Sequence, residues 1–109
     1  MNYQQGRTVQ EAVTTAEPAE VIEAAKEFFG RRSGIYAAFL EKEGPGYATF
    51  RGQGGEEVVI GTAPADGGTR VTGSTYLYDQ QVARFLALLP AEASLVGADV
   101  DPVAEPTAS

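Results

Sequence analysis

The chain has 109 residues, with 15 acidic and 8 basic side chains, and it contains no cysteine and no histidine. This length suits one domain around a single hydrophobic core. The missing cysteine excludes disulfides, thiolate nucleophiles and sulfur metal sites, and the missing histidine removes the commonest acid–base group and metal ligand. We therefore expect no metal, no cofactor and no convincing catalytic constellation.

The formal net charge is −7, and much of it lies in residues 91–109, which hold no basic side chain. The clusters of lysine and arginine that bind phosphate backbones are lacking, so nucleic acid is not an expected partner. The first residues lack the basic and apolar regions of a secretion signal, and no apolar run approaches the ~18 residues of a membrane span. We therefore expect a cytoplasmic protein without membrane contact.

The first elements follow from short patterns. Residues 1–6 show no periodicity and are expected to be frayed. Alternation over Arg7 to Thr15, with Val9 and Val13 on one side, predicts a strand. A helix is expected over residues 18–29, because it opens with proline and gathers its apolar side chains on one face.

Glycine-rich turns then divide the chain into four more strands and a closing helix. The expected strands are Ile35–Lys42, Tyr47–Gly52, Glu56–Ala63 and Arg70–Tyr78. The last strand runs directly into an amphipathic helix that opens at Asp79 and is stopped by Pro90. Residues 91–109 are small, acidic and rich in proline, which predicts a mobile tail.

The order strand, helix, four strands, helix predicts an α+β fold. We expect a single domain over residues 7–90, with a five-stranded antiparallel sheet and both helices on one face. Each helix has a single apolar stripe, and the strands need one partner layer, so this arrangement satisfies both.

Alternation also predicts which side chains face away from the helices. We expect Val71 and Leu77 to point inward along the last strand, and Ile35 and Phe39 to do so along the second. The opposite side then gathers tyrosine and arginine, residues that are enriched at contact sites, with Tyr76 nearest its centre. The expected binding residues are Tyr36, Leu40, Tyr47, Arg51, Arg70, Tyr76 and Tyr78. The competing interpretation is an ordinary solvated sheet face with scattered tyrosines.

Two pairs of carboxylates are the nearest approach to acid–base machinery. Adjacent residues of a strand such as Glu56 and Glu57 point to opposite faces, and the pair Glu41 and Glu43 borders a turn. We therefore expect solvated strand ends. The glycines at 52, 54 and 55 lack a following Lys-Ser or Lys-Thr, so they indicate a turn and not a phosphate loop.

Two stretches carry a family resemblance, VQEAVTTAEPAEVIEAAKEFF and TRVTGSTYLYDQQVARFLALLP. A strand that passes through proline into a helix, and a late strand that runs into a closing helix, resemble the ends of the START-related helix-grip (SRPBCC) superfamily, which includes polyketide cyclases. The element order is also similar to the TATA-binding-protein-like (TBP-like) fold. The resemblance implies that fold and an apolar or aromatic small-molecule ligand, and it implies no catalytic residues.

Two functions remain open from the sequence. In the first, the protein is a non-catalytic module that forms a homodimer, through the sheet face or edge, or binds another partner. In the second, it binds an apolar or aromatic small molecule, or acts on one as a cyclase-like enzyme. The missing histidine favours the first function, and the resemblance favours the second.

Overall fold

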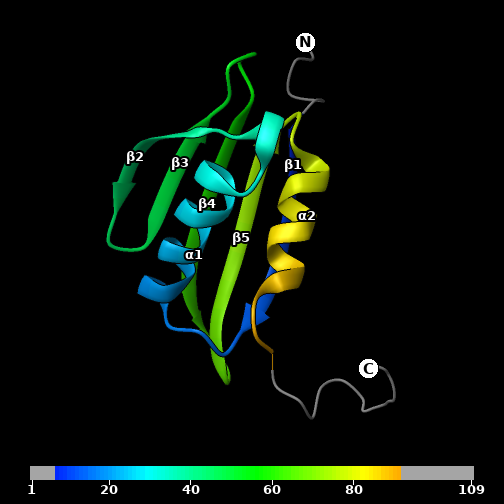
Figure 1. Cartoon of the computed structure of the whole chain (residues 1–109). Helices are drawn as coiled ribbons and strands as arrows, with labels where there is room; N and C mark the ends of the chain where they lie inside the picture. Colours follow the sequence, from blue (N-terminus) through cyan, green and yellow to red (C-terminus); the bar gives the residue numbers. More distant parts are fainter. Residues whose placement is uncertain (1–6, 92–109) are drawn as a thin grey trace.

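The computed structural model describes residues 7–91, so the expectations for residues 1–6 and 92–109 lie outside the described residues. The elements follow the expected order, which confirms the α+β fold (Figure 1). The strands are β1 (Arg7–Thr14), β2 (Phe39–Gly44), β3 (Tyr47–Arg51), β4 (Glu57–Ala65) and β5 (Gly68–Tyr76). The helices are α1 (Pro18–Arg31) and α2 (Asp79–Leu88), with a short 3-10 helix η2 (Gly34–Tyr36) between α1 and β2.

All five strands join in one antiparallel sheet with the order β1-β5-β4-β3-β2. Strands β2 to β5 form a meander, and β1 returns beside β5, with Arg7 opposite Tyr76 and Thr14 opposite Thr69. The first and the last strand of the chain are therefore neighbours. The edges of the sheet are β1 and β2, which lie at opposite ends of the strand order.

The first turn of helix α1 contains a proline and a carboxylate that caps the helix. Pro18 occupies the first turn, and the Glu20 carboxylate accepts a hydrogen bond from the backbone N–H of Glu17 at 2.8 Å. The helix runs two residues beyond the expected end at Phe29, because Gly30 continues the helix and the N–H of Arg32 closes it on the carbonyl of Phe28.

Both helices cover the same face of the sheet, as predicted (Figure 1). Helix α1 lies against β2, β3 and β4, and α2 lies against β5 and β1. The core between the layers is aromatic at its centre, where the Phe29 ring lies 5.3 Å from that of Phe50 and 5.4 Å from that of Phe85. Val82 of α2 sits directly over Gly73 of β5, where an added Cβ would be 2.6 Å from Val82 Cγ1.

The segment before β2 departs from the prediction. Gly34 adopts a positive φ of 59° and starts η2, so the chain is not extended from Ile35, which is 90% exposed and not inward. Phe39 pairs with Arg51 and shares its side of the sheet, away from the helices. Leu40 pairs with Phe50 and therefore lies on the helix side, so the expected orientations of Phe39 and Leu40 are both wrong.

Candidate interface on the open sheet face

The open sheet face is the side of the sheet on which no helix of residues 7–91 lies (Figure 1). Residues directly opposite one another in an antiparallel sheet point to the same side, so the register assigns its side chains. From β1 to β2, the first row holds Arg7, Tyr76, Glu57, Arg51 and Phe39. The second row holds Val9, Ser74, Val59, Thr49 and Lys42. The third row holds Glu11, Thr72, Gly61, Tyr47 and Gly44.

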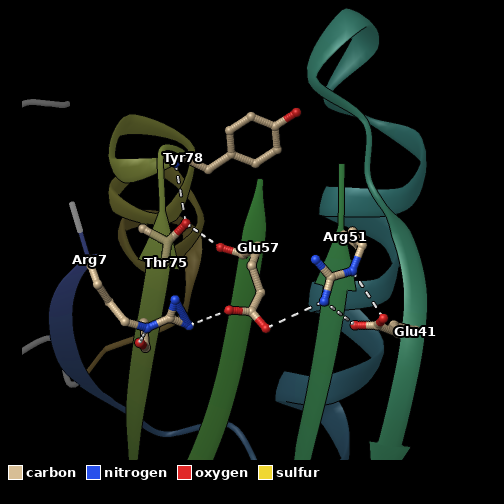
Figure 2. Close-up of polar contacts among 7 residues, drawn as sticks. Arg7, Glu41, Arg51, Glu57, Thr75 and Tyr78 are labelled. Atoms are coloured by element: carbon tan, nitrogen blue, oxygen red, sulfur yellow. Dashed lines mark hydrogen bonds and ion pairs between the residues drawn. The ribbon is translucent and has the colours of Figure 1, made fainter. Parts of the chain in front are cut away.

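An ion-pair network spans the first row (Figure 2). Arg7 Nη2 donates to Glu57 Oε1 at 2.7 Å, and Glu57 Oε2 lies 3.8 Å from Arg51 Nη2. On its other side Arg51 forms a two-pronged pair with Glu41, Nε to Oε2 at 3.0 Å and Nη2 to Oε1 at 3.2 Å. Positive and negative groups therefore alternate across the sheet in the order Arg7, Glu57, Arg51, Glu41. We call these four residues the charged row.

The charged row is partly exposed to solvent. Hydrogen bonding to Glu41, and then the negative charge of that carboxylate, raises the pKa of Arg51 above its usual value against a smaller opposing effect of desolvation. Arg51 therefore keeps its positive charge. Ion pairs as exposed as these contribute little to folding stability. Their structural effect is to hold four long side chains in an ordered pattern of charge on the surface.

Apolar side chains lie within the first row and beside it. Val9 and Val13 on the edge strand β1 are 64% and 41% exposed, Phe39 at the start of β2 is 58% exposed, and Tyr76 at the end of β5 is 40% exposed. Exposed apolar groups beside arginine are typical of contact surfaces. The open sheet face therefore combines an ordered charge pattern with apolar groups that a second surface can cover.

Four of the seven predicted binding residues lie on the open sheet face. Tyr47, Arg51 and Tyr76 belong to the first and third rows, and Arg70 lies beyond them on β5, where Nε is 3.2 Å from Glu11 Oε1. Strand β5 is flanked by β1 and β4. Tyr76 is not at the centre of the face, however, because it is the last residue of β5.

Tyr78 was expected on the open sheet face and lies in the core instead. Strand β5 ends at Tyr76, and Leu77 adopts a positive φ of 82°, which breaks the alternation. Leu77 is consequently exposed, and Tyr78 is only 6% exposed. Thr75 fixes this turn, because its hydroxyl donates to the Glu57 carbonyl at 2.6 Å and accepts from the N–H of Tyr78 at 3.3 Å (Figure 2).

Tyr36 and Tyr78 meet at a second place, beside the start of α2. Their rings are nearly perpendicular, with centroids 6.1 Å apart, and together with Glu56 and Leu77 they line an open hollow of about 500 Å³. Burial, followed by the negative charge of Glu56, raises the pKa of Tyr78. Leu40, the third predicted residue away from the open face, lines a separate hollow of about 280 Å³ with Phe39 and Phe50.

Sequence reasoning missed most of the charged row. Glu41 and Glu43 should share a side by simple alternation, but a bulge between Leu40 and Lys42 separates them. Glu41 consequently binds Arg51, whereas Glu43 binds Lys26 of α1 at 3.2 Å on the other side of the sheet. A signal was available for Glu57, because the sequence predicts that the side chains of the adjacent residues Glu56 and Glu57 point in different directions, as they do in the structure. Arg7 and Phe39 carried no such signal.

Comparisons with protein-family models, curated proteins and solved structures found no match to this chain. Within residues 7–91, no helix has the length and apolar character needed to cross a membrane. The same part of the chain contains no group of three or more acidic side chains placed to hold a metal ion.

Proposed function

We propose that the protein is a non-catalytic module that binds another protein surface through its open sheet face. The observation that carries this proposal is the combination of exposed Val9, Phe39 and Tyr76 with the charged row on a sheet face that no element of residues 7–91 covers. A sheet in a two-layer fold has one face for its own helices. The other face is available for a partner.

Physical chemistry favours binding at this face. A partner that covers Phe39 and Tyr76 removes apolar surface from water, which yields roughly 25 cal/mol per Å². Tyrosine and arginine, together with tryptophan, are enriched among the hot spots of measured interfaces. The intramolecular ion pairs already order Arg7 and Arg51, so binding loses less side-chain entropy than it would with free arginines.

The carboxylates support a structural role over a catalytic one. Glu41 and Glu57 are bound by arginines of the charged row, and Glu43 is bound by Lys26. Glu56 accepts a hydrogen bond from the backbone N–H of Gly54 at 2.9 Å and lies at the loop beside Tyr78. The two pairs that resembled acid–base machinery in the sequence therefore serve four separate contacts.

Site-specific photo-crosslinking tests the proposal and captures a partner of any identity. A photoreactive phenylalanine analogue replaces Tyr76 in one variant and Leu88 in the control, since Leu88 is 61% exposed and belongs to α2 on the helix side. We expect protein adducts from position 76 in cells that express the full chain, and none from position 88. Equal adducts from both positions, or none from position 76, would refute the proposal.

A second candidate function is the binding of an apolar or aromatic small molecule, which the helix-grip resemblance implies. It is favoured by the hollow beside Tyr36 and Tyr78. That hollow lies outside the layer between sheet and closing helix, where the superfamily encloses its ligands, and Val82 fills the space above Gly73 in that layer. A panel of aromatic ligands that raises the melting temperature of the wild type, but not of Tyr36→Ala, would support this function.

A further inference from the structure

We infer that the partner of the open sheet face is a second copy of this chain, related by a two-fold axis that runs along the strands between β3 and β4. The inference rests on the proposed function and adds the identity of the partner and its register. It follows from the order of the side chains in the first row. When a reversed copy of this row is laid against the original, each charge faces an opposite charge.

The charged row is the first observation. Its signs are plus, minus, plus, minus in the order Arg7, Glu57, Arg51, Glu41, so the reversed row places an opposite charge against each member. Two sheets that face each other across a two-fold axis along the strands meet in this reversed order. Glu57 then faces Arg51 of the second copy, and Arg51 faces the other Glu57.

The outer charges match as well. Arg7 belongs to β1, but its Nε donates to Ser74 Oγ at 3.0 Å and its Nη2 reaches Glu57, so its guanidinium lies over β5. The proposed axis maps β5 onto β2 of the second copy, where Glu41 lies. All four charges of one copy therefore meet opposite charges of the other.

The uncharged members of the rows are the second observation. The same axis sets Tyr76 of β5 against Phe39 of the second copy's β2, and both side chains are exposed in the single chain. Aromatic pairs of this kind are favourable beyond their buried area. In the third row Tyr47 of β3 faces Gly61 of the second copy's β4, and a Cβ built on Gly61 would meet no atom within 4 Å. A large ring thus meets an open position.

Neighbouring axes lack this complementarity. An axis along β4 sets Glu57 against its own copy, and an axis along β3 does the same for Arg51. An axis between β5 and β4 pairs only the Arg7 guanidinium, which lies over β5, with Glu57, and it leaves Arg51 and Glu41 without an opposite charge. An axis across the strands at the first row sets every residue of that row against itself. Like charges that meet, and charges left unpaired, cost free energy in a desolvated interface.

The size of the overlap predicts the strength of the dimer. Four strands about 4.8 Å apart and three residue rows about 6.7 Å apart give roughly 390 Å² per copy, or about 800 Å² in total. That area is below the ~1,000 Å² of a stable specific interface and is typical of a weak one. We therefore expect a reversible dimer that dissociates on dilution, with sheets aligned as in sandwich packing.

Charge exchange between two variants tests the inference. Glu57→Arg sets two arginines against each other across the axis, and Arg51→Glu sets two glutamates against each other, so each variant alone should raise the dimer dissociation constant at least about tenfold. A mixture of the two variants should form a heterodimer, because every member of the charged row then faces its opposite. Sedimentation equilibrium of the full chain measures both constants.

Three comparisons make the result decisive. The wild type should reach twice the chain mass of 11.5 kDa. The control Arg31→Glu changes charge equally on the exposed end of α1 and should dimerise like the wild type. A mixture no more dimeric than its components would overturn the inferred register. A wild type that stays monomeric would overturn the inference, while adducts between position 76 and a different protein would leave the proposed function standing.

Cysteine cross-linking provides a measurement that does not alter the charged row. The chain has no cysteine of its own, so Tyr76→Cys and Phe39→Cys introduce single reactive sites. A mixture of these variants should form a disulfide-linked heterodimer under mild oxidation, faster than either variant links to itself. Equal rates for the mixture and for Phe39→Cys alone would contradict the register.

Discussion

The contact between Gly73 and Val82 predicts a strong coupling between the sheet and α2. An added Cβ at residue 73 would lie 2.6 Å from Cγ1 of Val82 but 3.8 Å from its Cβ. Gly73→Ala alone should therefore destabilise the fold by about 1–3 kcal/mol through overpacking. Val82→Ala alone removes two fully buried methyl groups, which we expect to cost roughly 2 kcal/mol.

The double variant should be more stable than the sum of these effects. The alanine at residue 82 keeps only its Cβ, which leaves ordinary van der Waals contact with the new methyl group. We expect a favourable coupling of at least about 1 kcal/mol in the free energy of unfolding, measured by urea denaturation of all four chains. Additive effects, or a harmless Gly73→Ala, would refute the close packing and would indicate free space between sheet and helix.

Further predictions concern the tyrosines and the interface. Tyr78→Ser should lower the free energy of unfolding by about 3 kcal/mol or more. Tyr76→Ser should lower it by no more than about 1 kcal/mol and should weaken association. The reverse order of the two variants in urea denaturation would show that the two faces are wrongly assigned. Because the folded state raises the pKa of Tyr78 above 10.0, folding stability should fall as the pH rises past this value, and Tyr78→Phe should flatten that fall in urea midpoints. Added salt should weaken the dimer, because the Debye length falls from about 10 Å at 0.1 M to 3 Å at 1 M; an unchanged dissociation constant would contradict charge pairing.

The sequence predicted the fold well where periodicity was uninterrupted. Val71, Gly73 and Thr75 face the helices as alternation requires, and the apolar stripe of α2 packs on that side. Turn-forming glycines separated the strands of the meander. These features are local, so a single sequence displays them.

The predicted side-chain orientations are wrong where a positive φ or a bulge interrupts the alternation along a strand. The positive φ at Leu77 turned Tyr78 into the core, and the turn through Gly34 left Ile35 in solvent. The bulge before Lys42 moved Glu41 to Arg51. Tertiary contacts, such as that of Thr75 with Glu57, stabilise a positive φ at a non-glycine residue and a one-residue bulge. No local sequence pattern predicts either feature.

The charged row could not be predicted because it is assembled from four strands. Arg7 and Glu57 are fifty residues apart, and their contact depends on β1 pairing with β5 and β5 with β4. The strand order was therefore needed before the alternation of signs could be seen.

The central claim is that two copies of the protein bind each other through their open sheet faces, and an NMR dilution series of the 15N-labelled full chain tests it most directly. We predict that chemical shifts change with concentration at Tyr76, Glu57 and Arg51 and their neighbours in the first and third rows, while those of the exposed side of α1 stay constant. Concentration-dependent shifts confined to the helices, or shifts at β3 to β5 that do not change up to the solubility limit, would contradict self-association through this face.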